Sequence, residues 1–503
     1  MATIIPRRRR GAGRLRRAPT IAGCFAFGVL TLIGWPAGAR AASVRNAQQI
    51  SSDTLPGSVA GEHGTQGEPS MALDPRDPNR LVSLFQVRRF KDGGSAAIGY
   101  ATSHDGGAIW ARGILPGLTR ASGGEFPRAS NPTVAFGPDG TVYAESLLVT
   151  PSRRACVPAS RTAIAVQRST DGGLSFGPPV IAQDDRASCH GTLKINDKPW
   201  IAVDTSDGPH RGRLYLVWTQ LPSQLVERHS DDGGTHWSAL QRIAFPGDAI
   251  GAVALVGPDG NVTIVLNNGD HVNPVAYAIS SPDGAASWGE PRRISRLRAG
   301  GPDGIRLGPP GGFPAAAVDP TDGALYVAWR DYRFRRNTLA PAAHAVAYSD
   351  ILISRSRDGG RTWSAPRRVT ARARASTLQN FMPAVAAHGG DVSVSYLAAR
   401  EGSLLARPLL SVSHDGGATF DGAIGLGPRL DLRYAARTCF GCGTRYAERT
   451  RFLGDYMGIA AGPGLAYAVW PRPSRRGTAD YHQTTWSTTA TWSQAGSTNA
   501  LIP

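Results

Sequence analysis

Long apolar runs are scarce in this chain of 503 residues. After residue 45 no stretch has the length and period of an amphipathic helix. The one extended apolar segment, residues 21–35, is shorter than the roughly 20 residues that cross a bilayer. These absences argue against a helical bundle and against a transmembrane protein. Glycine (61) and proline (37) are plentiful, so we expect many short strands and tight turns, and an all-β fold.

Acidic residues are missing from the first 41 positions, which hold eight arginines. A cationic stretch, an apolar stretch and the small residues of 37–41 follow one another in the order of an export signal, with cleavage expected after Ala41. The pair Arg16-Arg17 leaves the Sec and Tat export routes both open. We therefore expect a secreted or periplasmic protein with no stable membrane span after signal cleavage.

Three segments follow from this reading: a signal peptide (1–41), a single folded domain (42–490) and a polar C-terminal tail (491–503). The formal charge is +17 for the whole chain and +9 once the signal is removed. A basic mature protein favours an anionic ligand. Blocks of basic residues interleaved with aromatics are absent beyond the signal, so nucleic-acid binding is not expected.

The pattern Ser-x-Asp-x-Gly-x-x-aromatic occurs six times, as in "SHDGGAIW" (103–110) and "SRDGGRTW" (356–363). In a tight turn a carboxylate can accept N–H groups that the turn leaves unpaired, and glycine permits a left-handed backbone. A catalytic group is not needed six times, so we assign the six aspartates a structural role. They are Asp105, Asp171, Asp232, Asp283, Asp358 and Asp415, and Ala285 replaces the glycine of the fourth copy.

A second pattern alternates with these turns: an apolar strand, a Gly/Pro/Asp turn and another strand, as in "PAAAVDPTDGALYVAW" (314–329). Each such hairpin followed by an aspartate turn makes a four-stranded unit, and such units are typical of β-propeller blades. Seven hairpins predict seven blades, with six as the alternative. Residues 44–51 resemble a fourth strand and are expected to complete the last blade. A closed ring leaves few free edges, which predicts a monomer.

With these turns the chain resembles the sialidase superfamily of propellers, whose repeats are called Asp-boxes, from about residue 60 to 486. The likeness extends most to secreted sialidase-like members, and it implies a glycoside hydrolase of exo-sialidase type that acts on acidic or decorated glycans. Because such boxes also occur in proteins without catalysis, a propeller that only binds glycan or protein at its loop-rich face is the alternative. Neither reading calls for a metal or a cofactor.

Topology places the loops after the second strand and before the first strand of each blade around one mouth. Arginines gather in those loops and could bind a carboxylate or phosphate through paired N–H donors, although a solvated, salt-bridged rim is the alternative. The candidate substrate-binding residues are Arg88, Arg330, Arg333, Arg400 and Arg472. The stretches "NDK" (196–198) and "RFLGDY" (451–456) precede first strands and belong to the same face.

The resemblance also implies a tyrosine nucleophile with a glutamate partner and an aspartate acid/base. Asp92 lies where that aspartate is expected, and Tyr456, with Tyr332 as second choice, is the candidate nucleophile. Glu401 or Glu145 would be its partner. The chain departs from sialidases in lacking their Arg-Ile-Pro motif. Gly67 stands where its arginine belongs and Glu68 follows, an acid that would oppose a carboxylate ligand.

Cysteine is rare, with five in the chain and four beyond the signal. An even number in an oxidising compartment suggests disulfides. Cys156 and Cys189 lie in loops of the mouth face and can pair, and Cys439 and Cys442 are expected to form a local disulfide. A metal site at this Cys-x-x-Cys would need two further ligands.

Overall fold

The structure is a computed structural model that describes residues 42–152, 159–187, 194–270, 272–298, 305–306, 312–334, 349–370, 378–438, 450–477 and 481–493. The chain divides into Met1–Ala39 and Arg40–Pro503, and all described residues belong to the second part. The predicted signal peptide, residues 494–503 of the tail and all four remaining cysteines lie outside them. The disulfides Cys156–Cys189 and Cys439–Cys442 therefore stay predictions.

Most of the described strands are sorted here into antiparallel runs of four or five, numbered as blades 1 to 7 in chain order. The pairing of Ser95 with Ala129 joins the first two runs into one eight-stranded sheet. Blade 1 holds β3 (Gln66–Asp74), β4 (Asp77–Arg89), β5 (Ser95–Ser103) and β6 (Ala111–Ile114). Blade 2 holds β7 (Arg128–Phe136), β8 (Val142–Pro151), β9 (Ala159–Ser169) and β10 (Val180–Arg186). Blade 3 holds β11 (Ile195–Val203), β12 (Leu214–Leu221), β13 (Gln224–Ser230) and β14 (Gln241–Ile243).

The next three blades repeat this order. Blade 4 holds β15 (Ile250–Val256), β16 (Val262–Asn267), β17 (Val275–Ser281) and β18 (Arg292–Arg296). Blade 5 holds β20 (Ala315–Val318), β21 (Leu325–Asp331), β22 (Asp350–Ser356) and β23 (Arg367–Arg368). Blade 6 holds β24 (Leu378–His388), β25 (Asp391–Arg400), β26 (Leu405–Ser413), β27 (Ile424–Gly425) and β28 (Leu430–Asp431).

Blade 7 combines the two ends of the domain: β31 (Gly458–Gly462), β32 (Leu465–Pro473) and β33 (Gln483–Thr491) are joined by β1 (Ser43–Val44) and β2 (Gln48–Gln49). Both short N-terminal strands pair antiparallel with β33. This is the closure that the sequence predicts for residues 44–51.

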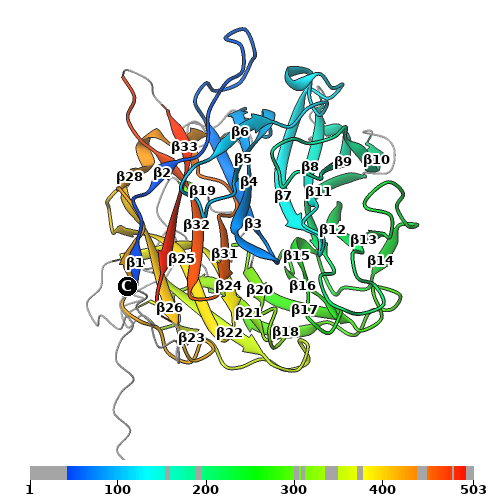
Figure 1. The fold of residues 1–503 in the computed structure, drawn as a ribbon, viewed down its shortest axis with the longest axis vertical. Coiled ribbons are helices and arrows are strands. Elements are labelled where there is room, and N and C mark those ends of the chain that lie inside the picture. Colours follow the sequence, from blue (N-terminus) through cyan, green and yellow to red (C-terminus); the bar gives the residue numbers. More distant parts are fainter. Residues whose placement is uncertain are drawn as a thin grey trace, which may run out of the picture. The chain divides into compact units, whose positions relative to one another are not determined.

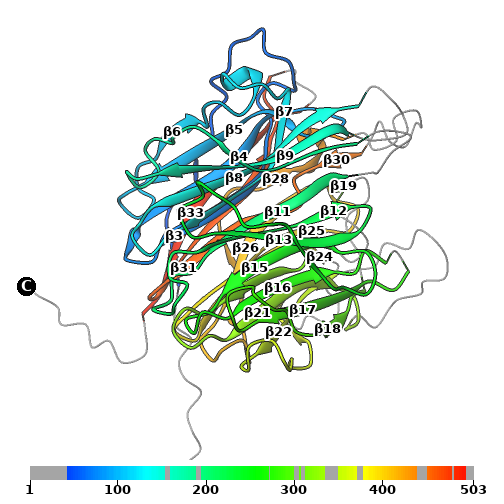
Figure 2. The same cartoon turned by 90° about the vertical axis from the view of Figure 1, so that its right-hand side faces the viewer.

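The first strands of the seven blades contact one another in turn, from β3 through β7, β11, β15, β20, β24 and β31 back to β3. In Figure 1, β3, β15, β20, β24 and β31 surround the centre of this ring, and Figure 2 shows strands of blades 3 and 4 lying side by side. The fold is an all-β propeller, as predicted. In the described residues no α-helix occurs, and the helical turns are two 3₁₀ segments, η1 (Arg120–Ser122) and η2 (Leu432–Tyr434). Nor does that part of the chain hold a helix long and apolar enough to cross a membrane.

Apolar side chains fill the space between neighbouring blades, because each blade buries both faces. Between blades 2 and 3, for example, Ile164 and Val166 pack with Leu214, Leu216 and the fully buried Trp218. The loops of the mouth face add a small three-stranded sheet. It joins β19 (Ile305–Arg306), from the connection between blades 4 and 5, to β29 (Ala436–Arg437) and β30 (Arg451–Phe452), from the connection that leads to blade 7.

The six aspartate turns share one hydrogen-bond pattern. In each, the serine hydroxyl donates to the aspartate over 2.7–2.9 Å and accepts the N–H of the residue four positions after the serine over 2.8–3.0 Å. The aspartate also accepts a backbone N–H four residues after itself. In the first turn the N–H of Ile109 and the hydroxyl of Ser103 hold the pKa of Asp105 below its usual range. These bonds fit a structural turn, and the role assigned to the six aspartates stays a prediction.

The turns also fasten blades to each other. In five of the six, the carbonyl of the glycine after the aspartate accepts a hydrogen bond from the adjoining blade; the donor is Thr489 to Gly106, Thr102 to Gly172, Arg213 to Gly284, Ser280 to Gly359 and Arg355 to Gly416. A local turn therefore carries contacts that hold the ring together.

Candidate functional site

The first strand of most blades is interrupted near its mouth end by the same distortion. The pairing register shifts in β3, β7, β11, β15 and β24, so each strand carries a bulge. Four bulges hold a non-glycine residue with positive φ: Glu68 (50°), Asn131 (45°), Lys198 (52°) and Met382 (51°). A proline follows each of the four. Strained residues and bulges that re-aim side chains are features of functional sites.

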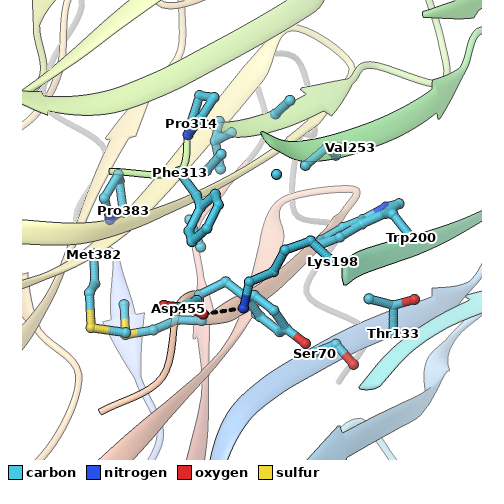
Figure 3. Close-up of a pocket in the computed structure, with 18 of the residues that line it drawn as sticks. Ser70, Thr133, Lys198, Trp200, Val253, Phe313, Pro314, Met382, Pro383 and Asp455 are labelled. Carbon is cyan, nitrogen blue, oxygen red and sulfur yellow. Dashed lines mark hydrogen bonds and ion pairs between the residues drawn. The ribbon is translucent and has the colours of Figure 1, made fainter. Parts of the chain in front are cut away.

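A cavity of about 140 Å³ lies inside the ring at these bulges. Every blade contributes to its lining, for example with Ser70, Thr133, Trp200, Val253, Phe313, Pro383 and Tyr456. Figure 3 shows side chains from these segments facing a common space, with Phe313 and Lys198 near its middle. In the described lining the charged residues are Lys198, Arg330 and Asp455, and most of the remaining wall is apolar.

Lys198 and Asp455 form an ion pair within this cavity (Figure 3). Their side chains are 16% and 5% exposed. The ammonium nitrogen of Lys198 also lies 3.7 Å from Oε1 of Glu68, a side chain that is 2% exposed. Burial alone would lower the pKa of Lys198, but the carboxylates of Asp455 and Glu68 outweigh burial and raise it. Lys198 is therefore charged at neutral pH.

For Glu68 the effect of burial on the pKa is larger than that of the neighbouring Lys198. Burial raises its pKa to about 7, Lys198 opposes that rise and Asp455 adds to it. Its Oε2 accepts hydrogen bonds from the side chain of Gln86 (2.6 Å) and the N–H of Asn131 (3.2 Å). Glu68 does not line the cavity itself but lies behind Lys198. The site thus holds a carboxyl group that exchanges its proton near neutral pH beside an ion pair.

Tyr456, the predicted nucleophile, lines the cavity next to Asp455. Its hydroxyl donates to the carbonyl of Pro132 (3.0 Å), and its ring meets that of Trp200 edge to face at 5.9 Å. Burial raises the pKa of Tyr456 well above its usual value, and the carboxylates of Glu68, Glu145 and Asp455 raise it further. The phenol is therefore neutral in this state.

The structure places the other predicted catalytic residues elsewhere. Asp92 is half exposed and forms an ion pair with Arg128 (2.8 Å). Glu401 is exposed. Glu145 is buried and accepts a hydrogen bond from Thr133 (2.8 Å), a residue of the cavity wall, and its charge acts on Tyr456. Burial raises the pKa of Glu145 well above its usual value.

Of the five predicted arginines, Arg330 lines the cavity, and burial lowers its pKa to about 10. Arg88 binds Asp53 and the carbonyls of 55, 56 and 59. Arg333 forms a two-pronged contact with Asp331, Arg472 lies over the ring of Trp486, and Arg400 is exposed. Within the described lining the five arginines do not converge.

Lys198 and Asp455 were missed as individual residues, although both lie in the stretches expected at the mouth. The signal that could have found Lys198 is the repeated X-Pro at first-strand starts, in "EPSM", "NPTV", "KPWI" and "MPAV". A residue before proline avoids the right-handed helical region, so the recurring pair marks a repeated backbone feature. None of the six turn aspartates belongs to the described lining.

Comparison with known proteins gives distant likenesses. No known family profile matches the chain. A xyloglucanase from Paenibacillus sp is 26% identical over 315 residues, which is 59% of this chain and 26% of the relative, so the chain spans about a quarter of that protein's length.

Two solved structures illustrate the structural likeness. An ulvan lyase of polysaccharide lyase family 25 has a TM-score of 0.47 and 14% identity, covering 84% of this chain and 94% of the lyase. A leech intramolecular trans-sialidase has a TM-score of 0.45 and 12% identity, covering 76% of this chain and 70% of the enzyme. The strand pairing itself shows the fold class of this chain, an all-β propeller with its candidate site on the ring axis.

Proposed function

We propose that this protein is a glycan-acting enzyme, a glycoside hydrolase, and that its substrate enters the axial cavity. The observation that carries the proposal is the buried cluster of Lys198, Asp455 and Glu68 at the cavity wall. The likeness to a xyloglucanase supports glycan as the substrate class.

Glycoside hydrolases commonly rely on carboxyl groups whose protonation state is set by their surroundings. Asp455 contacts the cavity and is paired with a permanent cation, which favours its ionised form. Glu68, with a pKa of about 7, carries a proton for part of the time at neutral pH. We assign Asp455 as the catalytic residue, and Glu68 as a positioning residue that sets the protonation of the cluster through Lys198.

The narrower exo-sialidase reading assigns Tyr456 as nucleophile with Asp92 as acid/base and Arg330 as a ligand for a sugar carboxylate. The position of Tyr456 and Arg330 in one cavity supports it. The acid at Glu68, where sialidases have Arg-Ile-Pro, speaks against it. A neutral or decorated glycan therefore fits the cavity better than a sialoside.

The test is an assay of the purified protein, from residue 42 onward, on aryl glycosides, sialosides and xyloglucan oligosaccharides. With a substrate found, Asp455→Asn should lower kcat/KM by about 100-fold or more, whereas Asp92→Asn, an equal change at the exposed rim, should leave it nearly unchanged. Circular dichroism and the Tm check that both variants fold. The reverse result would move the acid/base to the rim. Glycan binding with no turnover on any substrate would contradict the proposed enzymatic activity and favour a propeller that only binds glycan.

The wild-type pH profile provides a second readout. The value of kcat/KM should fall above about pH 7, as Glu68 loses its proton, and Glu68→Gln should remove that dependence. A profile that is the same in both proteins would exclude Glu68 from the mechanism.

We also propose that the chain is exported by cleavage after Ala41. The order of cationic, apolar and small residues in 1–41 supports this. Amino-terminal sequencing of the protein from its culture medium or periplasm tests the cleavage site, and titration of free thiols tests the two disulfides.

A further inference from the structure

The methionines of this protein are gathered at one place. The chain has four, and the three beyond the initiator, Met71, Met382 and Met457, all line the axial cavity. They come from blades 1, 6 and 7, which follow one another around the ring. They therefore form a continuous arc on one side of the cavity. Methionine is flexible and polarisable, and it is favoured where a protein surface must fit an apolar ligand.

Beyond the bulges, apolar side chains line the cavity together with the hydroxyl residues Ser70 and Thr133. Val134, Val253 and Val385 line the cavity two or three residues beyond the bulges of their first strands, and Ile459 lines it from β31. Three of these side chains are at most 9% exposed. Asn131, Lys198 and Met382 lie at bulges, and Asp455 lies just before β31. A ligand that fills the cavity meets Asn131 and Lys198 on the side of blades 2 and 3, and thioether groups on the side of blades 6, 7 and 1.

Aromatic rings lie beside the polar groups of the cavity. Phe313 and Trp200 lie on either side of Lys198 in Figure 3, and the ammonium nitrogen of Lys198 is 5.4 Å from the centre of the Phe313 ring. Flat rings suit the C–H faces of a pyranose, while a charged pair and an amide suit its hydroxyls.

We propose that the axial cavity binds a sugar residue that carries a small apolar substituent, with the substituent directed into the methionine arc. The ligand's identity as a sugar rests on the proposed function, and the apolar substituent rests on the methionine arc and the valine and isoleucine wall. A buried hydroxyl directed at the three thioether groups would lose its hydrogen bonds to water and meet only weak acceptors there. The cavity therefore discriminates against an otherwise equal sugar with a hydroxyl there.

Two chemical sources supply such a substituent: the C6 methyl of a 6-deoxyhexose and the acetyl of an O-acetylated hexose. Two pairs of probes separate them. Methyl α-L-fucopyranoside and methyl α-L-galactopyranoside differ only by a 6-hydroxyl, and methyl 6-O-acetyl-β-D-galactopyranoside and its unacetylated form differ only by the acetyl. Affinities of the purified protein are measured by titration calorimetry, which does not depend on turnover.

We expect the apolar member of one pair to bind about tenfold more tightly or better, since one methyl in an apolar pocket discriminates on that scale. Preference in the first pair assigns the 6-deoxyhexose, and preference in the second assigns the acetylated sugar. Equal affinity within both pairs, or no binding of any of the four probes, overturns the proposal. Probe binding with the expected preference but without hydrolysis of any glycoside would support this binding proposal and contradict the proposed enzymatic activity.

Variants locate the preference in the wall. Val253→Thr keeps the shape of the side chain and adds a hydroxyl to the cavity, so it should reduce the preference to about threefold or less. Val385→Thr serves if that variant does not fold. Val272→Thr, the same change at a side chain that is 83% exposed, is the control and should retain the wild-type preference. An unchanged preference in both folded cavity variants would also contradict the proposal.

Discussion

Lys198 and Asp455 are 257 residues apart in the chain, and their side chains meet across the axis of the ring. They belong to the starts of first strands in blades 3 and 7, and those two strands are not neighbours in the ring. Like the edge-to-face contact of Trp200 with Tyr456, the contact of Lys198 with Asp455 ties these segments together. It also places one cation between two buried carboxyl groups.

Loss of that cation should be costly. Lys198→Met keeps most of the side-chain volume but removes the ammonium group that pairs with Asp455, and removing one member of a buried pair costs about 3–5 kcal/mol. Lys198→Met combined with Asp455→Asn removes both charges and should recover part of the loss. Urea unfolding of the wild type, both single variants and the double variant measures the coupling. The exposed pair of Arg211 and Asp207 is the control, and Arg211→Met should hardly change the free energy of unfolding.

The pH dependence of stability should show the sign that a raised carboxyl pKa requires. The folded protein holds the proton of Glu68 up to about pH 7, whereas an unfolded glutamate loses it near 4.5. The folded state thus binds more protons in that window, so the Glu68 contribution favours folding below pH 4.5 and is lost as pH rises to about 7.

Glu68→Gln should remove this dependence. Between pH 4.5 and 8 the free energy of unfolding of Glu68→Gln should rise relative to wild type, at most by an amount on the order of 3 kcal/mol, and its Tm should rise relative to wild type accordingly. Glu290→Gln, at an exposed position, should shift the profile by less than about 0.5 kcal/mol. Parallel Tm profiles for wild type and Glu68→Gln would show that the carboxyl is not protonated in the folded protein.

The second glycine of the aspartate turns allows a comparison between two blades. Gly107 and Gly173 have nearly the same backbone, with φ of 80° and 90°. A methyl at Gly107 would meet its nearest neighbour at 3.4 Å, but one at Gly173 would lie 2.4 Å from Cγ2 of Val82. Gly107→Ala should therefore cost about 1–2 kcal/mol for the left-handed backbone alone, and Gly173→Ala clearly more. Thermal unfolding of the two variants measures both stability costs, and equal costs would contradict this prediction. Ala285 shows that one copy tolerates the methyl at a φ of 72°.

Closure by the N-terminal strands can be tested in trans. Protein that begins at residue 52 lacks β1 and β2, which cover β33, and it should lose several kcal/mol of stability with the burial of Ile50. A synthetic peptide of residues 42–51 should restore the Tm in a concentration-dependent way. A truncated protein as stable as the wild type would mean that these strands do not hold the ring.

The architecture was predictable because its signals are local. Each aspartate turn is specified within eight residues, and a carboxylate, a hydroxyl and a glycine in that order admit one hydrogen-bond pattern. Hairpins that alternate with such turns leave little choice of fold. The closing strand was found for the same reason, since residues 44–51 look like the outer strands of other blades.

The site was predictable as a region and not as a set of residues. The partners of the charged side chains at the mouth are set by how the blades pack in the assembled ring. Arg333 turns to Asp331 and Arg88 to the segment around Asp53, whereas Lys198 reaches the opposite wall. The bulges that aim Lys198 and Asn131 inward arise from strand register, which is a property of the assembled sheet.

Blade 7 has a consequence for how the ring can be cut. Ser43 pairs with Thr491, and their hydroxyls lie 2.8 Å apart, so the two ends of the domain are neighbours. A short linker from residue 493 to residue 42 would make the chain circular, and new termini could then be opened in any exposed loop between blades. The ring therefore does not depend on which blade comes first along the chain. Circularly permuted forms should assemble the same axial cavity.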